Sequence, residues 1–152
     1  MADEVDINID QGSSFAYHME WTDDNGNGID LTQYTAKMDV RRSVIADKKV
    51  LSMHGCTVDS DGNALNRGIT HGGSTGEFTQ GAGIAGVGGI KLGVTSTGGT
   101  GMSGGIMIEI DSTSSNYIPS GRHFYDLEVV FPSNEVKTIL NGTFELAREV
   151  TR

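Results

Sequence analysis

The chain has 152 residues and carries 11 basic against 20 acidic side chains, a formal net charge of −9 at pH 7. This length fits a single domain with a substantial hydrophobic core. The acidic balance argues against a nucleic-acid partner, because binding to phosphates needs clustered lysine and arginine side chains.

The N-terminus and the apolar runs bear on where the protein is made. Residues 1–6 are acidic and contain no apolar stretch, which does not fit a cleavable signal peptide. No apolar run approaches the ~20 residues that a membrane-spanning helix needs. We therefore expect synthesis in a cytoplasm and no membrane partner. Cys56 is the only cysteine, so we expect no intramolecular disulfide.

Alternation of apolar and polar residues predicts strands along the first third of the chain. Residues 5–9 alternate, and residues 34–40 and 50–54 form two further strands. Polar turns rich in Asp, Asn and Gly lie at residues 23–28 and 59–63. The strongest strand pattern covers residues 15–21, before the first of these turns. It places four large side chains on one face: Phe15, Tyr17, Met19 and Trp21. We expect Trp21 to anchor the core.

The end of the chain predicts a hairpin followed by a third strand. Residues 125–131 and 136–140 alternate around a polar turn at 132–135, and Asn141-Gly142 marks a second turn into residues 143–146. The alternation turns Leu127 and Val129 inward, together with Tyr34 and Met38. Residues 43–51 and 144–150 lack the apolar spacing of a helix, so we expect loop or strand there.

Many short strands separated by turns predict an all-β fold. We expect an antiparallel β-sandwich of immunoglobulin-like character, forming one domain over residues 1–152.

Residues 68–105 differ from the rest because they hold most of the 22 glycines. Glycine weakens both helices and strands, so the segment is either a flexible surface excursion or an arm that orders against neighbouring subunits. In both cases we expect it to be mobile in the isolated subunit, and residues 72–101 to be dispensable for the fold. The arm interpretation gives a candidate partner-contact set: Ile84, Val87, Ile90 and Leu92.

Several motifs match a site pattern only in part. The turn that starts at Asp23 begins like a calcium loop, but the twelfth position, which should be Glu, is Tyr34. Residues 81–86 match G-x-G-x-x-G, yet more glycines follow where a helix should begin. The four histidines show no metal-ligand spacing. We therefore expect no catalytic residue, no metal site and no cofactor.

Both ends of the chain carry motifs in a fixed order. Residues 10–15 read D-Q-G-S-S-F, and residues 28–43 contain G-I-D-L-T, Y-T-A and V-R-R-S. Residues 125–129 read Y-D-L-E-V, and the chain ends in E-V-T-R. In this order the motifs resemble those of small β-sandwich structural proteins of bacteriophage particles, adaptor-like subunits of the tail or baseplate. The resemblance covers residues 5–45 and 118–152, whereas residues 55–117 have no counterpart in it.

The resemblance implies a non-enzymatic virion structural protein, made in the bacterial host cytoplasm and then located in the particle. It implies a tail, baseplate or fibre-adaptor subunit that contacts other virion proteins, and we expect it to form a homo-oligomer there. A capsid decoration (cement) protein is the alternative, since a small acidic β-domain with a glycine-rich arm could staple capsid subunits together. Two other classes stay open: an enzyme, and a carbohydrate-binding β-sandwich that uses exposed aromatics such as Tyr117, Phe124 or Tyr125.

Overall fold

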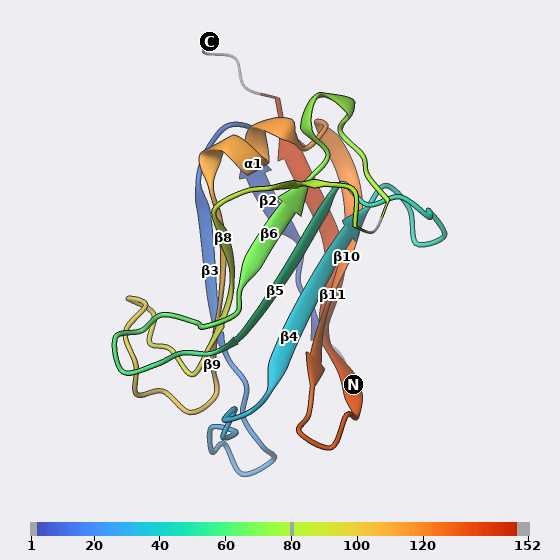
Figure 1. Cartoon of the computed structure of the whole chain (residues 1–152). Coiled ribbons are helices and arrows are strands. Elements are labelled where there is room, and N and C mark those ends of the chain that lie inside the picture. Colours follow the sequence, from blue (N-terminus) through green and yellow to red (C-terminus); the bar gives the residue numbers. More distant parts are fainter. Residues whose placement is uncertain (1–2, 80, 149–152) are drawn as a thin grey trace.

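Strands are the main secondary structure of the computed structural model of the chain, which describes residues 3–79 and 81–148 (Figure 1). The first strands are β1 (Asp3–Glu4), β2 (Ile7–Asp10), β3 (Phe15–Glu20), β4 (Thr35–Arg41), β5 (Leu51–Thr57) and β6 (Gly68–His71). After the 3₁₀ helix η1 (Gly73–Thr75) come β7 (Ile84–Ala85), β8 (Gly88–Leu92), β9 (Gly105–Ile110), the helix α1 (Ser112–Tyr117), β10 (Gly121–Val130) and β11 (Val136–Ala147).

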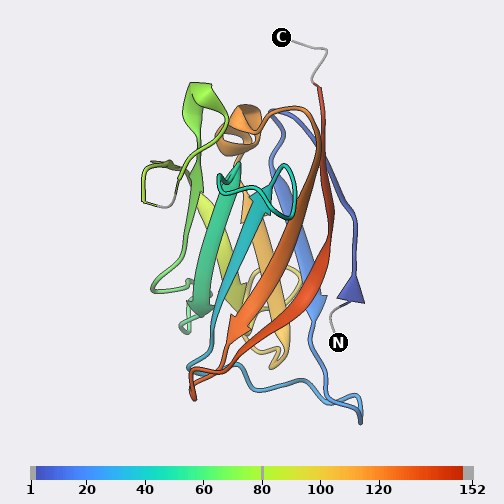
Figure 2. The ribbon, with the colours of Figure 1, turned by 90° about the vertical axis from the view of Figure 1, so that its right-hand side faces the viewer.

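The strands form a curled sheet in the order β1-β11-β10-β4-β5-β8-β9-β3, with β2 also beside β11, and β6 between β5 and β7. The sheet curves so that β3, β9 and β8 lie across the core from β4, β10 and β11 (Figure 2). The prediction of an all-β fold is confirmed. The prediction of a purely antiparallel sheet is wrong, because β1 and β2 run parallel to β11, and β5 runs parallel to β8.

The inward faces of the predicted strands are confirmed, but their burial differs. Met38, Leu127 and Val129 are completely buried. The four large side chains of residues 15–21, by contrast, pack against the core and stay half-buried. The cause is the position of β3, which ends the sheet and has a neighbouring strand, β9, on one side only. Trp21 therefore lies at the border of the core rather than in its centre.

The C-terminal hairpin is confirmed, and the second turn is wrong. In the turn, the Phe131 N–H donates to the Glu135 carbonyl at 2.8 Å, and Asn134 has a φ of 71°. Strand β11 then runs through Gly142 without turning. A Cβ at this glycine would lie 2.3 Å from the Val5 carbonyl oxygen, so the glycine allows the N-terminal segment to approach the strand closely.

The glycine-rich segment contributes core strands, which contradicts its interpretation as an excursion or arm. It contains β6, β7, β8 and the first residue of β9. Ile69, Ile90, Leu92 and Val94 are all buried. Glycines do not prevent strands here because neighbouring strands hold the backbone on both sides of β8. Between β5 and β8 a small residue is even required, since a Cβ at Gly55 would lie 1.7 Å from the Ile90 carbonyl oxygen.

The helix α1 was not predicted, because its sequence is polar and has no apolar stripe. Its signal is the residue before it. Asp111 is the N-cap and accepts a hydrogen bond from the Ser114 N–H at 3.3 Å. The helix also fixes the turn between β2 and β3, because the Ser115 hydroxyl donates to the Ser13 carbonyl at 2.7 Å. It lies at one end of the sheet (Figure 1).

Candidate interaction surface

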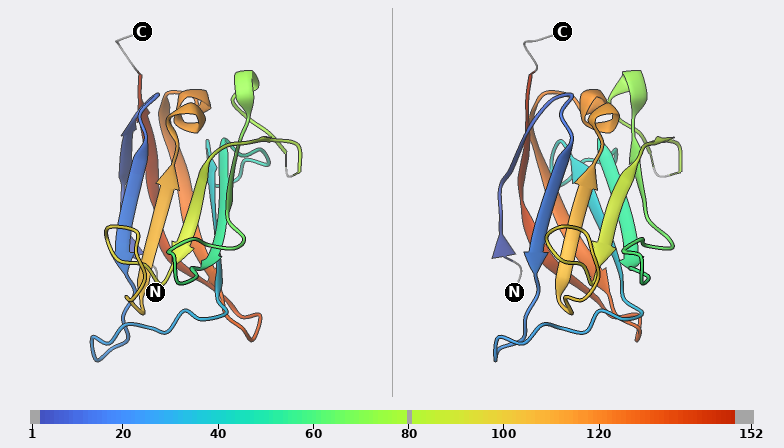
Figure 3. Two further views of the ribbon diagram at one scale, coloured as in Figure 1. Left: turned by 60° about the vertical axis from the view of Figure 1, so that its left-hand side comes forward. Right: turned by 90° about the vertical axis from the view of Figure 1, so that its left-hand side faces the viewer.

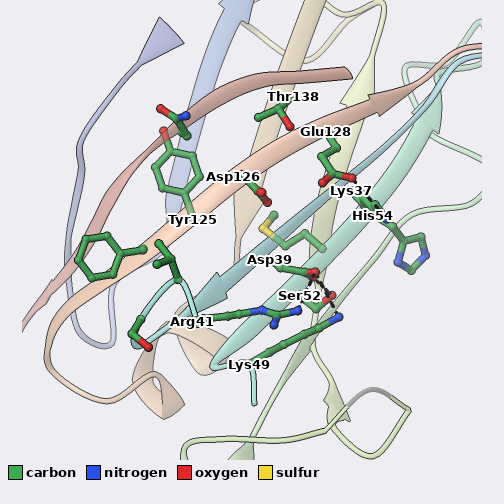
Figure 4. A pocket seen from close by; sticks show the side chains of 15 residues that line it. Lys37, Asp39, Arg41, Lys49, Ser52, His54, Tyr125, Asp126, Glu128 and Thr138 are labelled. Carbon is green, nitrogen blue, oxygen red and sulfur yellow. Dashed lines mark hydrogen bonds and ion pairs between the residues drawn. The ribbon is translucent and has the colours of Figure 1, made fainter. Parts of the chain in front are cut away.

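A hollow of about 900 Å³ lies on the outer face of β4, β5, β10 and β11 (Figure 4). The face exists because inward and outward side chains alternate along these strands, and the outward ones are polar. The hollow is lined by Lys37, Asp39, Arg41, Ser43, Val44, Lys49, Ser52, Met53, His54, Phe124, Tyr125, Asp126, Glu128, Thr138 and Asn141.

Strand register arranges the polar side chains of the hollow in two cross-strand rows. One row contains Thr138, Glu128, Lys37 and His54, in the order of strands β11, β10, β4 and β5. The second row, in the same order of strands, contains Asn141, Asp126, Asp39 and Ser52. The first row pairs opposite charges, and the second places two carboxylates directly opposite each other, an arrangement that destabilises a sheet.

Two cations and one hydroxyl surround Asp39 and compensate part of this repulsion. The Lys49 Nζ lies 3.2 Å and the Arg41 Nη2 3.9 Å from Asp39 Oδ2. The Ser52 hydroxyl donates to Asp39 Oδ1 at 2.8 Å. In the first row, Lys37 Nζ lies 3.4 Å from Glu128 Oε2. The surface thus carries a network of paired charges (Figure 4).

Among the carboxylates of the two rows, Asp126 is the one that has no cation at ion-pair distance within the described residues. Burial raises the pKa of its carboxyl above the ordinary value, and the negative charges of Glu128 and Asp39 raise it further. Arg41 and Lys37 oppose the shift. The ionised carboxylate therefore has an unfavourable environment that a cation from a partner would improve.

Exposed apolar side chains border one end of the hollow. Val44 is 81 % and Ile45 87 % exposed, and Phe124 is at the limit of exposure with 36 %. Val44 and Phe124 also line the hollow. We call these three residues the apolar rim. Large apolar side chains grouped on a surface typically mark a site of protein contact.

The loop that carries two residues of the apolar rim is anchored at both ends. The Arg41 Nη1 donates to the Ala46 carbonyl at 2.7 Å. Lys49 and Phe78 exchange two backbone hydrogen bonds of 2.9 Å, and an ion pair joins Arg42 to Glu77. Val44 and Ile45 are therefore presented by a loop with a defined conformation, which lowers the entropy cost of binding.

The structure separates the four residues of the candidate partner-contact set. Ile90 and Leu92 are completely buried in β8, so the prediction that they contact a partner is wrong. Ile84 and Val87, which precede β8, are 55 % and 73 % exposed. For these two residues, contact with a partner stays a prediction.

We did not predict from the sequence that two of the four histidines are buried. His71 accepts a hydrogen bond at Nδ1 from the Gly73 N–H at 3.1 Å and stacks on Tyr117 with 4.9 Å between ring centroids. His123 donates from Nδ1 to the Phe144 carbonyl at 3.2 Å. Burial lowers the pKa of both imidazoles below the ordinary value. The alternation of β10 could have indicated that His123 points inward, but no residue pattern distinguishes His71.

The two Asp-rich turns use their carboxylates locally. Asp23 Oδ1 accepts hydrogen bonds of 2.9 Å from the N–H groups of Asn25 and Asn27. Asp59 does the same for Asp61 and Asn63. Such Asx turns fix a tight loop without a ligand. Among residues 3–79 and 81–148, no three His, Cys, Asp or Glu side chains are grouped so as to hold a metal ion.

The three aromatic residues considered for carbohydrate binding lie in different environments. Tyr125 is buried, and its hydroxyl donates to the Val5 carbonyl at 2.6 Å. Tyr117 uses one ring face to stack on His71. Phe124 belongs to the apolar rim, and it lines the hollow with an exposed ring. A shared aromatic platform of these three residues is therefore not formed.

Comparison of the chain with models of known protein families and with curated proteins finds no match. Within the described part of the chain, no helix has both the length and the apolar character that crossing a bilayer requires.

Proposed function

We propose that this chain is a non-enzymatic structural subunit of a bacteriophage particle, in the tail, baseplate or fibre adaptor, which acts through contacts with other virion proteins. The apolar rim carries the proposal. It combines exposed apolar side chains on an anchored loop with an adjoining face of paired charges. Protein interfaces likewise combine apolar contact area with polar and charged groups.

The arrangement of the resembling segments supports the same role. Residues 5–45 and 118–152 supply β2, β11, β10 and β4, which are consecutive neighbours in the sheet, and also β3, at the other end of the path. The first four strands form one contiguous part of the sheet, and the hollow spans three of them together with β5. We expect this arrangement if the motifs at both ends of the sequence belong to one structural unit that this chain has in common with the proteins it resembles.

The resemblance also suggests the immunoglobulin-like sandwich, which we retain as a proposal. Its support is the packing of the two halves of the curled sheet. The ring of Trp21, after β3, meets that of Phe131, after β10, edge to face at 6.0 Å. An experimental structure of the particle would decide whether the halves separate into two sheets.

Capsid decoration remains the alternative role, because an apolar rim could equally contact capsid subunits. The arm invoked for it finds less support, since β8 is part of the sheet. A carbohydrate-binding role also finds less support, because Tyr125 is buried and Tyr117 is stacked on His71.

The test measures incorporation into particles. Phage particles carrying the wild-type gene are purified and their proteins quantified by mass spectrometry, and a cryo-EM map then locates the subunit. The variant Ile45→Asp places a charge in the apolar rim and should reduce incorporation severalfold, because the charge must be desolvated at the interface.

The matched control is Leu65→Asp, since Leu65 is 85 % exposed but follows the other end of β5. It should be incorporated normally. Thermal melts of both purified variants check that each still folds. Absence of the wild-type chain from purified particles contradicts the virion role, and equal incorporation of both variants contradicts the rim as contact surface.

A further inference from the structure

Strand β3 ends the sheet, and one of its edges has no partner within the described residues. Its six residues pair with β9 in a regular antiparallel register, without a bulge. The opposite edge of β3 faces the opening of the curled sheet, next to β2 (Figure 3). An unpaired strand edge offers a row of backbone donors and acceptors to another chain.

The hydrogen bonding beside β3 tells which residues face this free edge. The Trp21 N–H donates to the Gly104 carbonyl at 2.7 Å, in register with the ladder between β3 and β9. In an antiparallel ladder every second residue bonds the same neighbour. Phe15, Tyr17 and Met19 therefore bond β9, whereas the backbone N–H and C=O groups of Ala16, His18 and Glu20 point to the free edge.

The free edge of β3 lacks the features by which proteins usually block an edge strand. Its six residues include no lysine, arginine or proline, the pairing has no bulge, and Glu20 at its end is the one acidic side chain. The β1–β2 edge differs, because it consists of two very short strands with exposed Asp3, Glu4, Asn8 and Asp10 side chains. One edge of the sheet is thus protected by charge and shortness, and the other is open to pairing.

We propose that β3 pairs antiparallel with β3 of a second copy of this chain, with His18 of both copies at the two-fold axis. This register forms hydrogen bonds between the edge-facing groups of each copy. His18 lies opposite His18 of the partner subunit, and Ala16 lies opposite Glu20 of the partner subunit. The curled sheets of the two copies then merge into one continuous sheet.

Side-chain complementarity favours a second copy as the occupant. On the inner face the register places Tyr17 opposite the partner's Met19, and Phe15 opposite the partner's Trp21. These residues are the ones left half-buried in the single chain, and aromatic cross-strand pairs stabilise a sheet. On the outer face Glu20 meets an alanine, so no like charges oppose each other. The pairing is self-complementary, as a two-fold interface must be.

The inference deepens the proposed virion role, because it names the surface of the homo-oligomer, and it rests on that role only for where the dimer acts. Its test uses the full-length purified chain in solution. Sedimentation velocity over a concentration series should show a monomer–dimer equilibrium. The dimer should strengthen with added salt, because each copy carries a net charge of −9.

A charge exchange tests the register. Ala16→Glu sets two like-charged pairs across the interface and should weaken dimerisation about tenfold. Ala16→Lys places a cation opposite Glu20 and should strengthen it. The double variant Ala16→Glu with Glu20→Lys restores opposite charges and should recover the wild-type constant. Leu65→Asp, in the exposed loop after β5, is the control and should leave the constant unchanged.

Two results overturn the proposal. One is a monomer at every concentration, which would also make a strand of another protein the better occupant. The other is a dimer that none of the β3 variants alters. Circular dichroism of each variant confirms folding before the comparison, and the rescue by the double variant separates the interface from damage to the monomer. A monomeric chain that is still found in purified particles would contradict this interface and leave the virion role intact.

Discussion

The aromatic side chains differ widely in how much of each ring is removed from water. Phe144 is completely buried in β11 and lies edge to face with Tyr125 at 6.3 Å. Trp21 is half-buried and borders the core, where Lys137 Nζ lies 5.8 Å from its ring centroid. Burial, rather than side-chain size, sets the cost of truncation.

Phe144→Ala should therefore destabilise the protein by about 3–5 kcal/mol. Trp21→Ala should cost about half as much, because part of the ring already contacts water and leaves no closed cavity. Chemical denaturation of both variants measures the two free energies of unfolding. A larger loss for Trp21→Ala than for Phe144→Ala would contradict the role given to burial.

Asp126 gives a second prediction at this scale, with a defined pH dependence. Its pKa is raised in the folded protein, so the folded state binds its proton more tightly than the unfolded state. The contribution of Asp126 to stability therefore falls as pH rises from the ordinary value of 3.8 through the raised pKa. Above that window the ionised carboxylate is unfavourable.

Asp126→Asn removes this charge and should stabilise the protein at pH 7 by a few tenths to about 1 kcal/mol. The gain should disappear as pH falls below 3.8, because the Asp126 carboxyl is then protonated in both the folded and the unfolded wild-type protein. Urea denaturation of both proteins over a pH series measures the difference. A gain independent of pH would contradict the electrostatic explanation.

At the scale of elements, the contact between β5 and β8 depends on one glycine. A Cβ at Gly55 would lie 1.7 Å from the Ile90 carbonyl oxygen, and neither backbone can retreat because both strands are paired on their other sides. Gly55→Ala should cost about 3 kcal/mol or more, by overpacking a rigid interface.

The control for this change is Gly99→Ala. Gly99 is exposed, and the nearest atom to its added Cβ would be Thr95 Oγ1 at 3.5 Å, an ordinary contact. It should change the free energy of unfolding by less than about 0.5 kcal/mol. Thermal denaturation of both variants decides, and similar losses would mean that the contact between β5 and β8 is not tight.

Strands with a clear alternation of apolar and polar residues were predictable from the sequence. Strands whose stability comes from pairing with neighbouring strands were not. Residues 34–40 and 125–131 each bury one face, so the period of two identified β4 and β10 and their inner residues. Strand β8 reads G-G-I-K-L and gives no such signal, because its stability comes from β5 and β9, which are distant in sequence. Asn141-Gly142 gave a false turn signal for the same reason: the N-terminal segment requires the glycine.

At the scale of the molecule, the candidate site was less predictable than the fold. The hollow joins side chains of four strands, and its rows follow from register, which the sequence alone does not give. The exposure of Val44 and Ile45 could not be predicted from the sequence either, because it depends on a loop that is anchored to residues 76–79. Only the alternation of Lys37, Asp39 and Arg41 indicated a charged outer face.

The whole molecule should fold without a metal ion. The carboxylates of Asp23 and Asp59 accept hydrogen bonds from their own loops, which stabilise these turns in the absence of a cation. Thermal melts with and without EDTA should coincide. A drop of the melting temperature by more than a few degrees in EDTA, reversed by added Ca²⁺, would show that one of the turns binds a metal.

The topology makes β8 the connection between the two halves of the molecule. In the path of hydrogen-bonded strands, β8 alone links β5, on the side of β4, β10 and β11, to β9 and β3. Deletion of residues 72–101 should therefore abolish cooperative folding, in contrast to the sequence-based expectation that this segment is dispensable. A matched control replaces residues 95–99 by Asn-Gly, since Val94 and Thr100 already form an antiparallel bridge that a two-residue turn can close. The control should keep a cooperative unfolding transition. Loss of that transition in the deletion alone, measured by circular dichroism against denaturant, is the expected result, whereas a deleted chain that still unfolds cooperatively would mean that the remaining strands form a sheet without β8.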